Sequence, residues 1–262
     1  MSKIRIGMIG VGQIAKSHLK QYTDINDAEI VAACDINERE LEAVSDEHAI
    51  PHRYTDFRKM LERDDLDSVD VCLHNNLHAG ATIAALEAGK NVYCEKPIAG
   101  TYADGKRMVE AAAATSKMLH IQLATLYSKE TRAAKTIIDA GELGSAYHAR
   151  STGFRRRGRP YVDGYGSRRF VQKEVSAGGA MFDMGVYHIA QLVYLLGLPA
   201  MERVSGKVYQ ETAMDEGRRS ESGYNVEELG LGLVRFVGGL TLDIIEAWAI
   251  QLDGFEGSSI VG

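Results

Sequence analysis

The chain has 262 residues, 45% of them hydrophobic and 25% charged, so it can bury a substantial core in one or two domains and is not typical of disorder. Its formal net charge of -6 argues against a nucleic-acid partner, although residues 155–159 form a locally basic run. No apolar stretch approaches the roughly 20 residues that span a bilayer, and the first residues lack the apolar core of a signal peptide, so we expect a cytoplasmic protein without a membrane partner.

The first apolar run, residues 4–9, ends in a glycine-rich turn that opens a helix. Gly10 suits a tight turn, Gly12 lets the backbone approach a pyrophosphate, and Ala15 lets helix and strand pack closely. The phosphates would lie at the helix N-terminus. The side chains next to them would be Gln13 and Ile14.

A second apolar run, residues 30–34, ends in Asp35. A carboxylate at that strand end can accept hydrogen bonds from the adenosine ribose and would repel a 2′-phosphate. The alternative is an ordinary strand–helix turn whose Asp caps the next helix. Because strand, glycine turn, helix and acidic strand end follow in order, the pattern predicts a dinucleotide site that favours NAD over NADP.

Strands and helices alternate through residues 1–122. The patterns predict helices at 38–48, 56–61, 79–88 and 102–114, and strands at 69–73, 91–94 and 118–123. Such alternation specifies an α/β domain with a parallel sheet wrapped by helices on both faces. No metal site is expected, because Cys34, Cys72 and Cys94 lie in apolar runs without CxxC spacing and are typical of reduced core residues.

The tripeptide Glu95-Lys96-Pro97 stands where the predicted strand at 91–94 ends. Ligands of open α/β sheets bind beyond the carboxyl ends of the strands, so Lys96 would face the ligand crevice. The proline restricts the backbone of Lys96 to extended conformations or could lock a cis bond, and either would fix the direction of the side chain. Lys96 is therefore a candidate acid/base group, although the tripeptide alone fits a surface lysine before a turn.

Residues 123–262 follow a different pattern. Helices are predicted at 130–140 and from 181 or 182 to 196, and extended runs at 146–154, 201–212, 229–236 and 240–250, with Gly238-Gly239 as a hairpin signal. Strands without intervening helices indicate an antiparallel or mixed sheet, and hence an α+β domain. Residues 155–176 are predicted to form a long polar loop, which is usually functional or mobile.

Three motifs together resemble the glucose-fructose oxidoreductase / inositol dehydrogenase / MocA family: GVGQIA at 10–15, and the stretches at 75–100 and 177–197. The resemblance implies an N-terminal Rossmann domain, a C-terminal domain with a large open, mostly antiparallel sheet that often forms a homo-oligomer interface, and hydride transfer between NAD(P) and a sugar, cyclitol or related alcohol. It also implies that Lys96 is the catalytic lysine, with a cis bond to Pro97. Further positions on the cofactor side would be Asn75, Asn76, His78 and Glu95.

Many members of that family carry a catalytic His four residues after an Asp. In this chain Asp183 is followed at four by Tyr187 and at five by His188. Residues four apart share a face of an α-helix, whereas one further step rotates the side chain by about 100°. Counting to Leu195 and Gly197 gives Tyr187 the catalytic position, as in the tyrosine-using branch of the family. We therefore expect His188 to face elsewhere, either satisfied in packing or in contact with substrate.

In the resulting hypothesis Lys96 and Tyr187 transfer the proton of the substrate hydroxyl, and Asp183 orients them or binds a neighbouring hydroxyl. A partly desolvated lysine can accept a proton near neutrality. Arginines of the 155–176 segment, Arg168 among them, could recognise a carboxylate, a phosphate or an acidic sugar. The alternative for the arginine run is a solvated loop or an interface strand.

Two other functions fit the same motifs. One is a glycosidase that oxidises and re-reduces its substrate with tightly held NAD, and the other is a non-catalytic sensor that binds a dinucleotide. The presence of both Lys96 and Tyr187 argues against a sensor, because a sensor does not need proton-transfer groups. Because members of the family are usually longer, we also expect a second domain that is shortened at its C-terminus.

Overall fold

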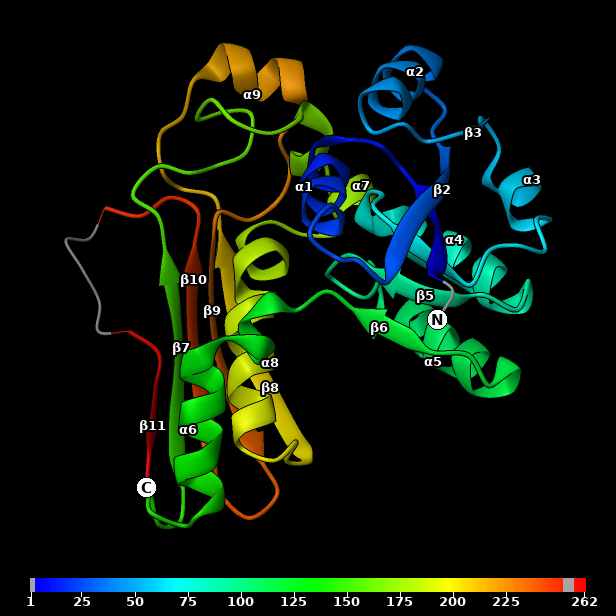
Figure 1. Cartoon of the computed structure of the whole chain (residues 1–262). Coiled ribbons are helices and arrows are strands. Elements are labelled where there is room, and N and C mark those ends of the chain that lie inside the picture. Colours follow the sequence, from blue (N-terminus) through cyan, green and yellow to red (C-terminus); the bar gives the residue numbers. More distant parts are fainter. Residues whose placement is uncertain (1–2, 252–256) are drawn as a thin grey trace. The chain divides into compact units, whose positions relative to one another are not determined.

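The computed structural model describes residues 3–251 and 257–262, and the chain divides into two compact units, Met1–Gln122 and Leu123–Gly262 (Figure 1). A six-stranded sheet lies in the first unit and a five-stranded sheet in the second. Each unit also has hydrophobic core clusters of its own.

The sheet of the first unit is parallel throughout, in the order β3-β2-β1-β4-β5-β6. Its strands are β1 (Ile4–Ile9), β2 (Ala28–Cys34), β3 (His52–Tyr54), β4 (Ser68–Val71), β5 (Asn91–Cys94) and β6 (Leu119–Ile121). Adjacent residues of β1 enter different cores: Met8 packs in one cluster and Ile9 in the other. Both faces of the sheet are therefore covered, as a parallel sheet requires. The predicted α/β fold is confirmed, although the short strand β3 was not predicted.

The helices of the first unit are α1 (Gln13–Tyr22), α2 (Glu38–Glu47), α3 (Phe57–Leu61), α4 (His78–Glu87) and α5 (Tyr102–Thr115), and a 3-10 turn η1 (Asn75–Leu77) precedes α4. The side chains of Asn37, Asp56 and Thr101 accept backbone N–H bonds and so cap α2, α3 and α5. Helix α1 begins differently, because its N-cap is Gly12 and no side chain caps it. The strand order reverses between β1 and β4, which is the position at which such sheets bind ligands.

The second unit has a mixed sheet in the order β11-β7-β10-β9-β8. Its strands are β7 (His148–Phe154), β8 (Met201–Tyr209), β9 (Leu229–Phe236), β10 (Thr241–Ala247) and β11 (Ser259–Val261). Strands β7 and β10 run parallel, and the other three pairs are antiparallel. The predicted hairpin joins β9 to β10, and Gly238 and Gly239 have φ of 92° and 93°, which glycine adopts without strain.

The helical segments of the second unit are η2 (Ala124–Tyr127), α6 (Lys129–Asp139), η3 (Arg168–Val171), α7 (Lys173–Ser176), η4 (Met181–Gly185), α8 (Val186–Leu195) and α9 (Glu216–Ser222). Apolar side chains of α8, Ile189 and Leu192 among them, pack in one core cluster with residues of β9 and β10. The helix predicted from 181 or 182 to 196 is not α-helical throughout, because η4 is a π-helical turn. The predicted 155–176 loop contains η3 and α7.

Within the part of the chain that the structure describes, no helix is long and apolar enough to cross a membrane.

Candidate active site

Two glycines with different roles form the turn between β1 and α1. Gly10 has φ +89°, and a Cβ at this position would collide with the carbonyl oxygen of Cys72. Gly12 is exposed, and a Cβ there would meet no atom within 4 Å. No side-chain hydrogen bond caps the N-terminus of α1 beside Gly12, so this helix end can accept an anionic ligand. This turn fits the pyrophosphate of a dinucleotide, with the exposed Gln13 and Ile14 at its edge.

Asp35 directly follows β2, and its carboxylate accepts a hydrogen bond from the backbone of the glycine turn. Its Oδ2 atom accepts the N–H of Val11 at 2.9 Å, and its Oδ1 atom accepts the N–H of Asn37 at 2.9 Å. Each carboxylate oxygen has a second lone pair, so the half-buried carboxylate can also accept a ribose hydroxyl. The acid predicted to bind ribose therefore also stabilises the phosphate turn.

Lys96 follows β5 and is half-buried, and its peptide bond to Pro97 is cis. The backbone N–H of Lys96 donates to Oε2 of Glu95 at 3.0 Å. His78 lies behind this turn, with Nδ1 2.8 Å from the Pro97 carbonyl oxygen and Nε2 3.0 Å from the Leu73 carbonyl oxygen. Burial lowers the pKa of His78, so its neutral ring donates only one of these two bonds.

His78 and Asn75 were both predicted on the cofactor side. Asn75 lies in η1 and is 5% exposed, whereas His78 is fully buried. Both ring nitrogens of His78 already face backbone carbonyls, so its ring cannot bind a cofactor without losing one of those contacts. In the first unit His78 therefore fixes the turn that carries Lys96.

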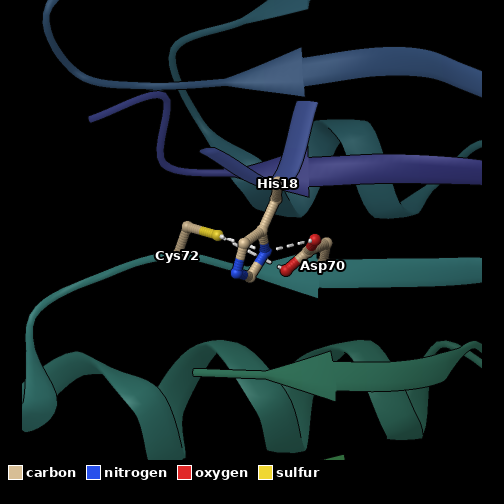
Figure 2. A group of neighbouring side chains, drawn as sticks. All are labelled: His18, Asp70 and Cys72. Carbon is tan, nitrogen blue, oxygen red and sulfur yellow. Dashed lines mark hydrogen bonds and ion pairs between the residues drawn. The ribbon is translucent and has the colours of Figure 1, made fainter. Parts of the chain in front are cut away.

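His18, on α1, is a buried group whose role the sequence pattern did not reveal. Its Nδ1 lies 2.9 Å from Oδ2 of Asp70, and its Nε2 lies 3.0 Å from Oε1 of Glu95. Figure 2 draws the contact between His18 and Asp70. Burial opposes the charged imidazole, but hydrogen bonds to both carboxylates outweigh it and raise the pKa of His18 to about 9. His18 thus links two buried carboxylates, those of Asp70 and Glu95, by hydrogen bonds.

Cys72 completes this cluster (Figure 2). Its Sγ atom lies 3.4 Å from Oδ1 of Asp70 and 3.4 Å from Nδ1 of His18. Burial raises the pKa of the Cys72 thiol, which therefore stays protonated and donates to Asp70. Such a trio has donor types that bind metals. The direct His18–Asp70 hydrogen bond and the protonated thiol instead make it a hydrogen-bonded network.

In the second unit, Asp183 and His188 both contact residues on one side of β10 and its continuation. The Trp248 indole N–H donates to Oδ2 of Asp183 at 2.9 Å, and Nδ1 of His188 lies 2.9 Å from Oε1 of Glu246. Glu246 and Trp248 are two positions apart, which places them on the same face. The π-helical turn η4 ends at Gly185 and His188 lies in the α-helix that follows, so regular α-helical spacing does not hold from Asp183 onward. His188 packs against Glu246, which is one of the two environments expected for it, and its contact with substrate stays a prediction.

The surroundings of His188 are tightly packed and polar. Glu246 is fully buried and also accepts the hydroxyl of Ser151 at 2.8 Å. A Cβ at Gly153 of β7 would collide with the His188 ring and with the Glu246 carboxylate. The hydrogen bond that His188 donates to the Glu246 carboxylate raises the pKa of His188. Among the described residues no hydrogen bond engages Nε2 of His188, whose side chain is 29% exposed.

Tyr187 lies between these two contact residues in sequence. Its backbone carbonyl accepts the hydroxyl of Thr125 in η2 at 3.3 Å, and its side chain is half-buried. Tyr187 is the second residue of α8, which begins at Val186 directly after the π-helical turn. Its backbone is thus fixed to a second element of the unit.

The arginine run at 155–159 separates into different environments. Arg159 is fully buried and pairs with Asp163 and Glu228, each at 2.9 Å, so it stabilises the fold and is not part of a solvated loop. Arg155 is exposed and lies 3.9 Å from Oδ2 of Asp183. The predicted substrate contact Arg168 is exposed at the first position of η3. Of the run itself, Arg155 is therefore the member that the structure brings near Asp183.

Comparison with known proteins identifies the family to which this chain belongs. Residues 4–123 match the family model described as "Oxidoreductase family, NAD-binding Rossmann fold", and residues 131–255 match the "GFO/IDH/MocA C-terminal domain". The chain belongs to the GFO/IDH/MocA family of oxidoreductases. The predicted family, enzyme class and cofactor are thereby confirmed.

Three relatives show the range of similar proteins. The D-glucoside 3-dehydrogenase of Escherichia coli (strain K12) is 30% identical over 96% of this chain and 72% of its own length. The inositol 2-dehydrogenase of Salmonella paratyphi B is 36% identical over 54% of this chain and 43% of its own length. The crystal structure of the WlbA dehydrogenase from Bordetella pertussis, in complex with NADH and UDP-GlcNAcA, is 25% identical, with a TM-score of 0.86 over 100% of this chain and 72% of that one. The match thus spans less than half of the inositol dehydrogenase.

Proposed function

We propose that the protein transfers a hydride between NAD and a secondary alcohol or carbonyl of a sugar or cyclitol, and that Lys96 and Tyr187 move the hydroxyl proton. The observation that carries the proposal is the fixed position of Lys96. Lys96 directly follows β5, its backbone N–H donates to the Glu95 carboxylate, and the carbonyl of the next residue, Pro97, contacts His78. The same unit carries the glycine turn and Asp35, which fit a dinucleotide.

The chain's own residues would hold NAD at three points. The open N-terminus of α1 beside Gly12 would bind the pyrophosphate, and Asp35 would bind the adenosine ribose. The negative charge of Asp35 favours NAD over NADP. Asn75 and the Lys96 turn would lie on the nicotinamide side. When bound, the nicotinamide supplies the hydride chemistry.

Proton transfer is assigned to Lys96 and Tyr187. During oxidation the Lys96 amine would accept the hydroxyl proton, and during reduction it would return a proton to the carbonyl oxygen. Tyr187 would share that proton or hold the substrate oxygen. Asp183, oriented by the Trp248 indole, would accept a hydrogen bond from a neighbouring hydroxyl. His188 would donate from Nε2 to another substrate hydroxyl, since Glu246 engages its Nδ1.

The proposed substrate class rests on the printed names of the relatives, which act on a D-glucoside and on inositol. Both are polyols with several adjacent hydroxyls, which suits a site that offers an amine, a phenol, a carboxylate and an imidazole. Arg155 and Arg168 would add affinity for an acidic substituent.

The test is oxidation of methyl β-D-glucoside and myo-inositol with NAD, followed by the appearance of NADH. Lys96→Met should lower kcat by about a thousandfold while NADH affinity, measured by fluorescence, changes less than about threefold. Lys106→Met, on the exposed side of α5, is the matched control. Substantial turnover by Lys96→Met would overturn the role of the lysine. Hydrolysis of an aryl glucoside without net NADH would identify a glycosidase, and NADH binding without any turnover would identify a sensor.

A further inference from the structure

The backbone of Lys96 is connected to α1 by a continuous chain of hydrogen bonds. Asp70 contacts Nδ1 of His18, Nε2 of His18 contacts Oε1 of Glu95, and Oε2 of Glu95 accepts the Lys96 N–H. The three side chains are nearly or fully buried, with exposed fractions of 0% for Asp70, 5% for His18 and 5% for Glu95. Water therefore has little access to the links between α1 and Lys96.

The two carboxylates in this series of hydrogen bonds favour a protonated His18. The groups that face His18 are Asp70 and Cys72 from β4 and its end, Glu95 and Tyr93 from β5 and its end, and Tyr22 from α1. A neutral imidazole has one N–H and cannot donate to both carboxylates, whereas the imidazolium donates to both. Two buried carboxylates without a cation between them would also be costly. The geometry thus favours one positive charge on His18.

We propose that the His18 imidazolium is a positioning residue for Lys96, because it holds the Glu95 carboxylate on the Lys96 backbone N–H. This inference rests on the proposed function of Lys96. It distinguishes the two bonds of His18: the bond to Glu95 controls the position of the lysine, and the bond to Asp70 anchors the imidazole to β4. Loss of the Glu95 bond frees that carboxylate to rotate away from Lys96.

Two substitutions separate the two bonds. The amide nitrogen of His18→Asn lies near the position of Nδ1 and can keep the contact with Asp70, whereas that of His18→Gln lies near Nε2 and can keep the contact with Glu95. Both variants remove the charge and have similar volumes. We expect His18→Asn to lower kcat about a hundredfold on the better substrate of the two-alcohol panel, and His18→Gln to keep at least about tenfold more of it. Equal losses, or a larger loss in His18→Gln, would contradict the proposal.

A second readout does not depend on turnover. In protein labelled with ¹⁵N-lysine, the Lys96 amide resonance is identified by its absence in Lys96→Met. His18→Asn should shift or broaden this resonance more than His18→Gln does, and Glu95→Gln, which keeps the His18–Asp70 contact, should shift it as His18→Asn does. If Lys96→Met retains activity but these shifts appear, the proposed function fails and the positioning contact stands. If the Lys96 amide is unchanged in Glu95→Gln and in whichever His18 variants fold, the positioning role is refuted.

Discussion

Nδ1 of His188 lies 2.9 Å from Oε1 and 3.0 Å from Oε2 of Glu246, a carboxylate with no solvent exposure. A buried acid in contact with one ring nitrogen orients the imidazole and favours its protonated form. The second ring nitrogen is then a donor. This donor is the group that we propose binds a substrate hydroxyl.

Glu246→Gln should lower the pKa of His188, because the amide removes the charge that stabilises the imidazolium. An NMR pH titration of the histidine side chains measures this shift directly. Asp243→Asn serves as the control, since Asp243 lies on the same strand and contacts His148 and Arg150. An unchanged His188 titration in Glu246→Gln would show that Glu246 does not set its charge.

His18 should make the stability of the fold depend on pH. Its pKa is raised from 6.5 to about 9 in the folded protein, so its stabilising effect is complete below pH 6.5 and is lost as the pH rises toward 9. The corresponding loss in the free energy of unfolding is on the order of 3 kcal/mol. Denaturant unfolding of the wild type and of His18→Asn at several pH values isolates this contribution. A slope as steep in the variant as in the wild type would assign the pH dependence to other groups.

The two glycines of the turn should respond differently to alanine. Gly10→Ala forces an alanine to φ +89° and against the Cys72 carbonyl, and we expect it to lower the free energy of unfolding by about 3 kcal/mol. Gly12→Ala meets no protein atom, so its cost should stay below about 1 kcal/mol, whereas its methyl group should weaken NADH binding at least about tenfold. Thermal unfolding and NADH titration of the pair separate the two effects. Equal NADH affinity in Gly12→Ala and wild type would place the pyrophosphate elsewhere.

Asp35→Asn should weaken the preference for NAD. The amide no longer repels a 2′-phosphate and offers one acceptor in place of two, so the ratio of kcat/KM for NADP to that for NAD should rise about tenfold. Asp24→Asn, on an exposed side chain, is the control. The same cofactor ratio in Asp35→Asn and wild type would exclude Asp35 from ribose recognition.

Local sequence signals account for much of the first unit. The glycine turn, the acidic end of β2 and the Lys96-Pro97 step each depend on neighbours in sequence, so their conformations could be predicted. The contacts of His18 could not, because Asp70 and Glu95 are 52 and 77 residues away and no periodic pattern links a polar helix residue to two strand ends. In the sequence His18 is only a polar residue of the first predicted helix. Its burial is known from the structure.

The second unit shows a different limit. The apolar content of residues 181–196 predicts a helix equally well for an α and a π turn at its start. The choice depends on contacts with Trp248 and Glu246, which belong to another part of the chain. The apolar pattern predicted the helix, but it could not show that Glu246 would hold His188.

One carboxylate, Asp35, accepts the Val11 N–H of the glycine turn and is also the group that we propose discriminates the cofactor. A change of cofactor made by replacing Asp35 would therefore begin by loosening the turn that every dinucleotide needs. Ile36 is next in sequence and 88% exposed, and its side chain does not hold the glycine turn. An arginine introduced there could attract a 2′-phosphate while the turn stays intact, so position 36 is the more permissive route by which this fold could acquire a different cofactor.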